Sequence, residues 1–71
     1  MKRETARLVS DLMVSMGASL DSSLSAVKVS EPDEEFRRYR DSVSKIMTTM
    51  LIEVMNPLYA EHPDLKPEQL R

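Results

Sequence analysis

The sequence predicts an all-helical fold in which two amphipathic helices form an antiparallel hairpin. The 71 residues contain few helix breakers, namely Gly17, Pro32, Pro57, Pro63 and Pro67. The prolines leave two long windows, about residues 2–30 and 33–56, in which a helix can form. Apolar residues recur at helical spacing in both windows, and a helix-start signal separates them. A short turn between two long helices places them side by side.

The first window predicts a helix over about residues 3–29 with one apolar face. Large apolar side chains follow one another at intervals of four and finally three residues: Leu8, Leu12, Met16, Leu20, Leu24 and Val27. Most charged residues fall on the opposite side, so the helix is amphipathic. One glycine and four serines between Gly17 and Ser25 weaken the helix. An alternative fold therefore has three short helices, with a break near Gly17.

A second helix start is encoded in residues 30–35. Ser30 is the candidate N-cap, Pro32 falls in the first turn, and the acidic residues 33–35 suit the positive end of the helix dipole. These signals predict a helix over about residues 31–56. Its apolar face carries Phe36, Tyr39, Val43, Ile46, Met47, Met50, Leu51, Val54 and Leu58.

Prolines shape the C-terminal part of the chain. The pair Asn56 and Pro57 is predicted to kink the second helix or to start a new one, with Asn56 as its cap. The helical hairpin then forms one domain over residues 1–60, and residues 61–71 form a proline-containing tail. Leu65 or Leu70 of this tail is expected to pack across the end of the bundle.

Composition narrows the class of protein. With no cysteine and one histidine, the chain offers no disulfide and no cysteine-based zinc site, which favours a reducing compartment. A net charge of −2 provides no overall attraction to nucleic acid or anionic lipid. No apolar run approaches the ~20 residues of a membrane span, and charged residues interrupt the N-terminal segment before a signal peptide forms. We expect a cytoplasmic protein without a membrane partner.

A hairpin of this size is expected to pair with a second copy. Two helices alone bury too little apolar area to offset the loss of chain entropy, and oligomerisation is the remaining source of stability. The expected assembly is a homodimeric four-helix bundle. Its interface is predicted on the apolar faces of both helices, at Leu8, Leu12, Met16, Leu20, Leu24, Phe36, Val43, Ile46, Met47, Met50, Val54 and Leu58.

No cluster of residues carries the pattern of a catalytic, cofactor or metal site. His62, with Glu61 and Asp64 beside it, lacks the two-histidine spacing of a metal site. The acidic residues 33–35 suit a helix start, and the serines have no histidine in the same helix to activate them. We therefore expect neither enzymatic activity nor a cofactor or small-molecule substrate.

Function is expected to lie in binding, and the favoured interpretation is a protein–protein interaction or scaffold module. Residues that lie off the main stripe of the second helix form its candidate partner surface: Ile52, Met55 and Tyr59. One alternative is a nucleic-acid-binding regulator with phosphate contacts from Arg37, Arg38, Arg40 and Lys45. Another alternative is a small chaperone or antidote that wraps a helix of a larger protein. Oppositely charged i,i+4 pairs, such as Asp33 with Arg37, favour a solvated face over a phosphate site.

Overall fold

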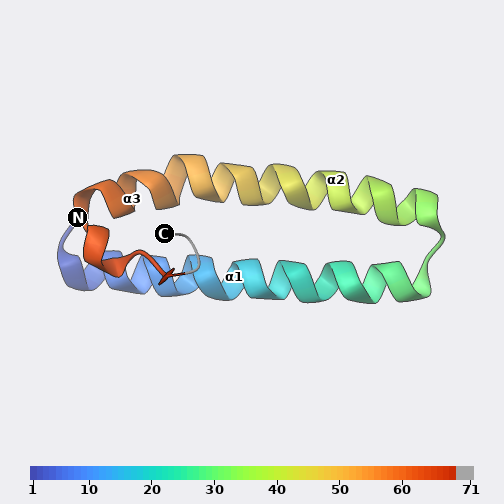
Figure 1. Cartoon of the computed structure of the whole chain (residues 1–71), viewed down its shortest axis with the longest axis horizontal. Coiled ribbons are helices and arrows are strands. Elements are labelled where there is room, and N and C mark those ends of the chain that lie inside the picture. Colours follow the sequence, from blue (N-terminus) through green and yellow to red (C-terminus); the bar gives the residue numbers. More distant parts are fainter. Residues whose placement is uncertain (69–71) are drawn as a thin grey trace.

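The computed structural model describes residues 1–68, and every regular element within them is helical. In chain order the elements are α1 (Arg3–Ser30), α2 (Asp33–Thr49), the π-helix η1 (Met50–Met55), α3 (Asn56–Glu61) and the 3₁₀ turn η2 (Pro63–Leu65). The elements α2, η1 and α3 follow one another as one rod, named the second rod, and α1 lies beside it (Figure 1). The predicted all-helical hairpin is confirmed.

The helix α1 continues through Gly17 without a break. It is a single helix of 28 residues, and Gly17 does not adopt a positive φ. The alternative fold of three short helices is therefore wrong. Glycine and serine lower helix propensity by up to ~1 kcal/mol each relative to alanine. Packing of α1 along both α2 and η1 outweighs this loss.

The connection between the two rods consists of Glu31 and Pro32. Ser30 is the last residue of α1, and its Oγ donates a hydrogen bond to the Ala26 carbonyl at 2.9 Å. Pro32 precedes α2 with an extended backbone, and α2 has no side-chain cap. The prediction of Ser30 as the N-cap is therefore wrong, because Pro32 sets the entry into α2. The acidic residues 33–35 do occupy the first turn of α2.

Pro57 widens the second rod without ending it. Proline lacks an N–H, and its ring collides with the carbonyl four residues earlier, which here belongs to Glu53. In η1, just before the proline, the Asn56 N–H donates to the Leu51 carbonyl, five residues back. Asn56 has αR backbone geometry, so the N-cap predicted at Asn56 is not formed. The second rod continues to Glu61, beyond the predicted end at residue 56.

The buried core is small and lies near the open end of the hairpin. Its cluster consists of Ala6, Leu58 and Tyr59, against which Val9, Met55 and Leu65 pack. Val43 and Met50 continue the buried row along the second rod. Leu65 comes from the tail, so the predicted packing of the tail is confirmed at this residue. Leu70, the other residue predicted to pack there, lies outside the described residues.

The seam between the rods differs from the predicted apolar stripe of α1. The buried residues of α1 that meet the second rod are small, namely Ala6 and Ser10. Leu8 and Leu12, which begin the predicted stripe, are instead 71% and 54% exposed. A row of residues spaced four apart drifts around a helix and leaves a straight seam. Only the C-terminal part of the stripe therefore turns toward the second rod.

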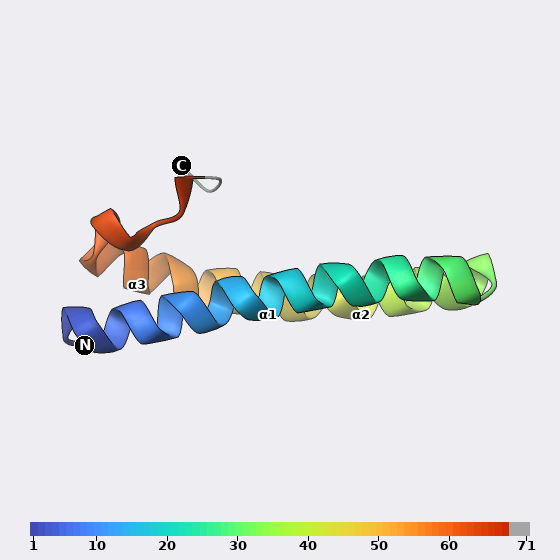
Figure 2. The same ribbon diagram turned by 90° about the horizontal axis from the view of Figure 1, so that it is seen from below.

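The hairpin is long and narrow. Its extents are 44 × 19 × 16 Å and its radius of gyration is 14.3 Å, compared with about 11 Å for a compact domain of this length. The segment that follows α3 rises from one face of the hairpin at its open end (Figure 2). The opposite face and the rest of the length carry no third layer within residues 1–68.

Replacing Val43 by alanine is expected to lower the free energy of unfolding by about 2 kcal/mol, because buried methyl groups are lost and a cavity remains. Val43 is 1% exposed, and the matched control is Val29→Ala at an 88% exposed position of α1. The control is expected to change stability by less than about 0.5 kcal/mol. Urea denaturation followed by circular dichroism measures both variants. Equal effects would contradict the burial of Val43.

Candidate functional site

The candidate site is the apolar surface that the hairpin leaves uncovered. Large apolar side chains are exposed on both rods: Leu8, Leu12, Val14, Met16, Val29, Ile46, Leu51 and Ile52. Contiguous exposed apolar surface of more than a few hundred Å² is rare on monomers and marks interaction sites. Most of these residues fall into two areas, which are described in turn as the groove and the outer stripe.

The groove is an open depression of about 450 Å³ between the two rods. It is lined by Met13, Val14, Gly17, Ala18, Asp21, Met47, Thr48, Met50, Leu51, Met55 and Pro67. Gly17 and Ala18 leave room for it because neither has a side chain larger than a methyl group. Even a Cβ added at Gly17 would meet no atom within 4 Å. Pro67 borders the groove from the tail.

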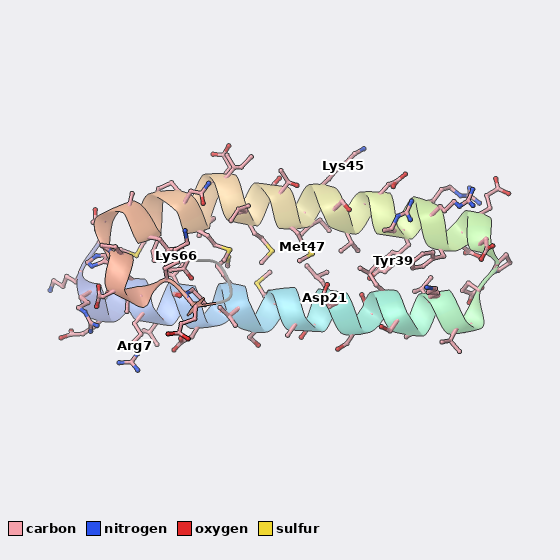
Figure 3. All side chains as sticks on the ribbon, in the orientation of Figure 1. Arg7, Asp21, Tyr39, Lys45, Met47 and Lys66 are labelled. Atoms are coloured by element: carbon pink, nitrogen blue, oxygen red, sulfur yellow. The ribbon has the colours of Figure 1, made fainter. Side chains whose placement is uncertain are left out.

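The lining of the groove suits a binding partner whose surface is apolar and carries a positive charge. Methionine contributes four of the lining residues, and its flexible thioether adapts to irregular neighbours. Asp21 is the one charged side chain among the described residues that line the groove. Asp21 from α1 and Met47 from α2 both point into the space between the rods (Figure 3). The Asp21 carboxylate and the methionine thioethers are therefore both presented to a partner that enters the groove.

The outer stripe comprises Leu8, Leu12 and Met16 of α1 together with Ile46 of α2. The three α1 residues are spaced four apart and lie outside the groove lining. Ile46 is 47% exposed. Like the three α1 residues, Ile46 does not line the groove. The outer stripe is thus a second uncovered apolar area.

Two hydroxyl pairs hold the rods in register. Ser10 Oγ and the Tyr59 hydroxyl are 2.6 Å apart in the core, and Ser23 Oγ and the Tyr39 hydroxyl are 2.6 Å apart where they are half-buried. Tyr59 is only 6% exposed. Tyr59 is therefore not part of an exposed partner surface, contrary to the prediction from the sequence. The sequence does not reveal that its hydroxyl pairs with a serine of the opposite helix.

The residues predicted for the dimer interface fall into three groups. Val43, Met50 and Leu58 are buried inside the hairpin. Leu20, Leu24, Phe36, Met47 and Val54 are half-buried along the seam. Leu8, Leu12, Met16 and Ile46 are exposed and form the outer stripe. Of the predicted partner surface, Ile52 is exposed and Met55 lines the groove.

The α1 wall of the groove is missing from the sites predicted from sequence. Val14 is an apolar residue on the otherwise charged side of α1, and Gly17 with Ala18 follows one turn later. This combination is a usable signal for a depression on a helix surface. It is interpretable only when the side of α1 that faces the second rod is known, since a glycine and an alanine also fit a tight helix contact.

The basic residues of α2 do not gather on one surface. Lys45 points away from α1 (Figure 3), and Arg38 lies two turns earlier on the same side of α2. Arg40 instead contacts Asp41 at 3.9 Å, and its guanidinium lies 5.8 Å above the Phe36 ring. A shared phosphate site needs several cations directed at one strand. The geometry of these residues does not provide that convergence within a single copy.

The tail is held against the start of α1 by ion pairs. The Met1 ammonium contacts Glu61 at 2.7 Å, and Arg3 Nε donates to Asp64 Oδ2 at 3.0 Å. Hydrogen bonding from the ammonium lowers the pKa of Glu61, and hydrogen bonding from Arg3 lowers the pKa of Asp64. His62 Nε2 lies 3.0 Å from Glu61 and from the Met1 carbonyl. These contacts close the open end of the hairpin.

The chain offers no further guide from known proteins. A scan against protein-family models, a search of curated proteins and a search of solved structures each found no match. Within residues 1–68 no helix has the length and apolar character needed to span a bilayer. In the same range no three His, Cys, Asp or Glu side chains gather as metal ligands would. The function is therefore inferred from the two apolar areas.

The substitution Tyr59→Phe is expected to destabilise the protein by about 1 kcal/mol or more, because it leaves the buried Ser10 hydroxyl without its partner. The matched control is Tyr39→Phe. Ser23 Oγ also donates to the Leu20 carbonyl at 2.7 Å, so the control is expected to change stability by less than about 0.5 kcal/mol. Thermal and urea unfolding measure both. A larger effect at Tyr39 would contradict the core role of the Ser10–Tyr59 pair.

Tail docking is expected to be lost at acid pH. A carboxylate whose pKa is lowered by folding stabilises the folded form above its ordinary pKa, and this contribution disappears as pH falls through the lowered value. Here the ordinary values are 4.5 for Glu61 and 3.8 for Asp64. The NMR signals of Leu65 should therefore remain constant near neutral pH and shift only below these values. Asp64→Asn should alter the Leu65 signals already at neutral pH, whereas Glu68→Gln should not.

Proposed function

We propose that this chain is a non-catalytic protein–protein interaction module that acts as a helical homodimer. One observation carries the proposal: the folded hairpin leaves two apolar areas uncovered, one on each side of the seam residues of α1. A two-fold dimer covers one self-complementary patch on each copy. One area is then hidden in the dimer, and the other remains for a protein partner.

The exposed area of the hairpin supports the proposal quantitatively. A compact monomer of 8.1 kDa is expected to expose about 4,500 Å². The hairpin exposes 5364 Å², which exceeds the expectation by roughly 900 Å². A standard stable interface hides about 800 Å² on each partner. The excess is similar in size to the area that one partner hides in such an interface.

The small core leads to the same conclusion. Val43 is the one large side chain that is fully buried within the described residues. Small domains without disulfides or metals commonly depend on association for their stability. A second copy of the same chain would add apolar contacts without requiring a different protein. Folding and dimerisation would then occur together.

Two observations support the non-catalytic part of the proposal. Every buried side-chain nitrogen or oxygen in residues 1–68 has a hydrogen-bond partner. The groove is open and contributes one carboxylate, whereas acid–base or nucleophilic chemistry needs a second group within hydrogen-bond reach. Binding of an apolar surface is what the groove and the outer stripe are suited to.

Light scattering on the purified chain is expected to give twice the 8.1 kDa monomer mass. The midpoint of thermal unfolding should rise with protein concentration, because dissociation accompanies unfolding. A mass of one chain together with a cooperative melt that is independent of concentration would contradict the dimer. A chain that is partly unfolded alone and folds only on a larger protein would support the chaperone alternative instead.

Two aspartate variants separate the roles of the two areas within that experiment. Leu51→Asp places a charge in the groove, and Leu12→Asp places the same charge in the outer stripe. One variant should lower the mass to that of a monomer, and the other should remain dimeric but fail to capture the protein that the unmodified chain captures. Ser22→Asp, on the exposed side of α1, is the control and should do neither. Two dimeric variants with unaltered capture would contradict the proposal.

A further inference from the structure

A line of uncharged residues runs along α1 beside the seam. Its members recur at alternating intervals of three and four residues: Val9, Leu12, Met16, Ser19, Ser23 and Ala26. We call these six residues the neutral line. The same alternation marks the positions at which one helix packs along another in a coiled coil.

The neutral line and the charges of α1 lie on opposite halves of the helix. Successive residues of an α-helix are about 100° apart around its axis, and this spacing places the charged residues together on the half away from the neutral line. They are Arg3, Glu4, Arg7, Asp11, Asp21 and Lys28. One side of α1 is therefore free of charge from end to end.

The neutral line lies on the face of the hairpin opposite to the groove. Val14 and Asp21 line the groove, whereas Leu12 and Met16 do not. At about 100° per residue, these two pairs flank the buried Ala6 of α1 on opposite sides. The uncharged side of α1 thus faces away from the groove.

The second rod contributes Ile46 to the same face. Met47 lines the groove, and Ile46 lies on the other side of the buried Val43. The tail borders the groove at Pro67, so within residues 1–68 the face that carries the neutral line and Ile46 is left bare (Figure 2).

Several hydroxyl groups on this face already have hydrogen-bond partners in their own helices. Ser23 Oγ donates to the Leu20 carbonyl at 2.7 Å. Ser42 and Thr49 lie one turn before and after Ile46, and each donates to the carbonyl four residues earlier, at 3.2 and 2.9 Å. A hydroxyl that is bonded within its own helix can be covered without becoming an unsatisfied polar group.

We propose that a second copy of this chain covers the face of the neutral line, with the two α1 helices packed antiparallel about a two-fold axis between Met16 and Ser19. This inference rests on the proposed homodimer and specifies that the dimer hides the outer stripe. The second rods then meet along the sides that carry Ile46, which gives a four-helix bundle. The groove stays open and is the area left for a protein partner.

The absence of charge favours a second copy as the occupant of this face. In a two-fold contact, residues near the axis lie beside their own counterparts, so a charge there meets the same charge. The neutral line satisfies this condition along its whole length. The groove does not, because the Asp21 carboxylate belongs to its lining and the tail stands on the same face.

Side-chain size favours the antiparallel arrangement. With the axis between Met16 and Ser19, each larger residue of one copy faces a smaller residue of the other. The facing pairs are Met16 with Ser19, Leu12 with Ser23, and Val9 with Ala26. The small residues then leave room that the large side chains fill. Parallel helices would instead set serine on serine and leave a gap between them.

The bare face is large enough for a stable dimer. In the view of Figure 1 the hairpin measures 44 × 19 Å, which is similar to the ~800 Å² that one partner hides in a standard interface. The neutral line extends over about 26 Å of that length at 1.5 Å per residue. Covering it also hides the exposed side chains of Leu12, Met16 and Ile46.

Two serine variants three residues apart test the interface. Ser19→Asp places a carboxylate beside the two-fold axis and should weaken dimerisation at least roughly tenfold, because the charge is buried next to its own counterpart. Ser22→Asp makes the same change on the charged half of α1 and should leave the affinity unaltered. Both serines are exposed on the single hairpin, so circular dichroism should show both variants folded. Sedimentation velocity at several concentrations measures the affinities.

The orientation of the two copies is tested by disulfide formation, because the chain has no cysteine of its own. Thr5 and Ser30 continue the neutral line by one step at either end and face each other in the antiparallel pair. A mixture of Thr5→Cys and Ser30→Cys should form a mixed disulfide on mild oxidation. Neither variant should link to itself, because its two cysteines lie about 38 Å apart along the bundle.

The outcomes separate this interface from the dimer itself. A wild-type chain that is monomeric would overturn both. A dimer that tolerates Ser19→Asp and Leu12→Asp but is lost on Leu51→Asp would overturn the interface alone and assign the contact to the groove. Thr5→Cys chains that link to themselves, without the mixed product, would overturn the antiparallel arrangement.

Discussion

Two helices side by side can hide only the strip of surface along which they touch, and the rest of this protein follows from that limit. In this hairpin the α1 side of the strip is fully buried only at the small residues Ala6 and Ser10, whereas larger residues such as Leu20 and Leu24 are half-buried. Small residues allow close contact but contribute little apolar area. Leucine and isoleucine side chains are left outside, where they favour association with another apolar surface.

Proline and tyrosine determine how the open end of the hairpin is built. The π-helix before Pro57 adds one residue to the turn and rotates everything that follows. As a result Leu58, rather than Pro57, continues the buried row of Val43 and Met50. Tyr59 follows Leu58 in α3, and its hydroxyl joins α3 to Ser10 of α1.

The two uncovered areas differ in chemical character. The groove combines four flexible methionines with a single carboxylate, that of Asp21. The outer stripe consists of exposed, uncharged leucine, methionine and isoleucine side chains. It provides apolar contact area but little to select a register, so specificity toward a partner has to come from the polar residues around it.

The sequence by itself determines the helical hairpin, because breaker positions, apolar periodicity and the acidic start of α2 all act locally. It does not determine which side of α1 meets the second rod. Leu8 and Leu12 have the periodicity of core residues yet are exposed, while Ser10 and Tyr59 are buried as a pair that spans most of the chain. The groove likewise exists only after Gly17 and Ala18 face Met47 across the seam. Such choices depend on contacts between residues far apart in sequence, which no local pattern records.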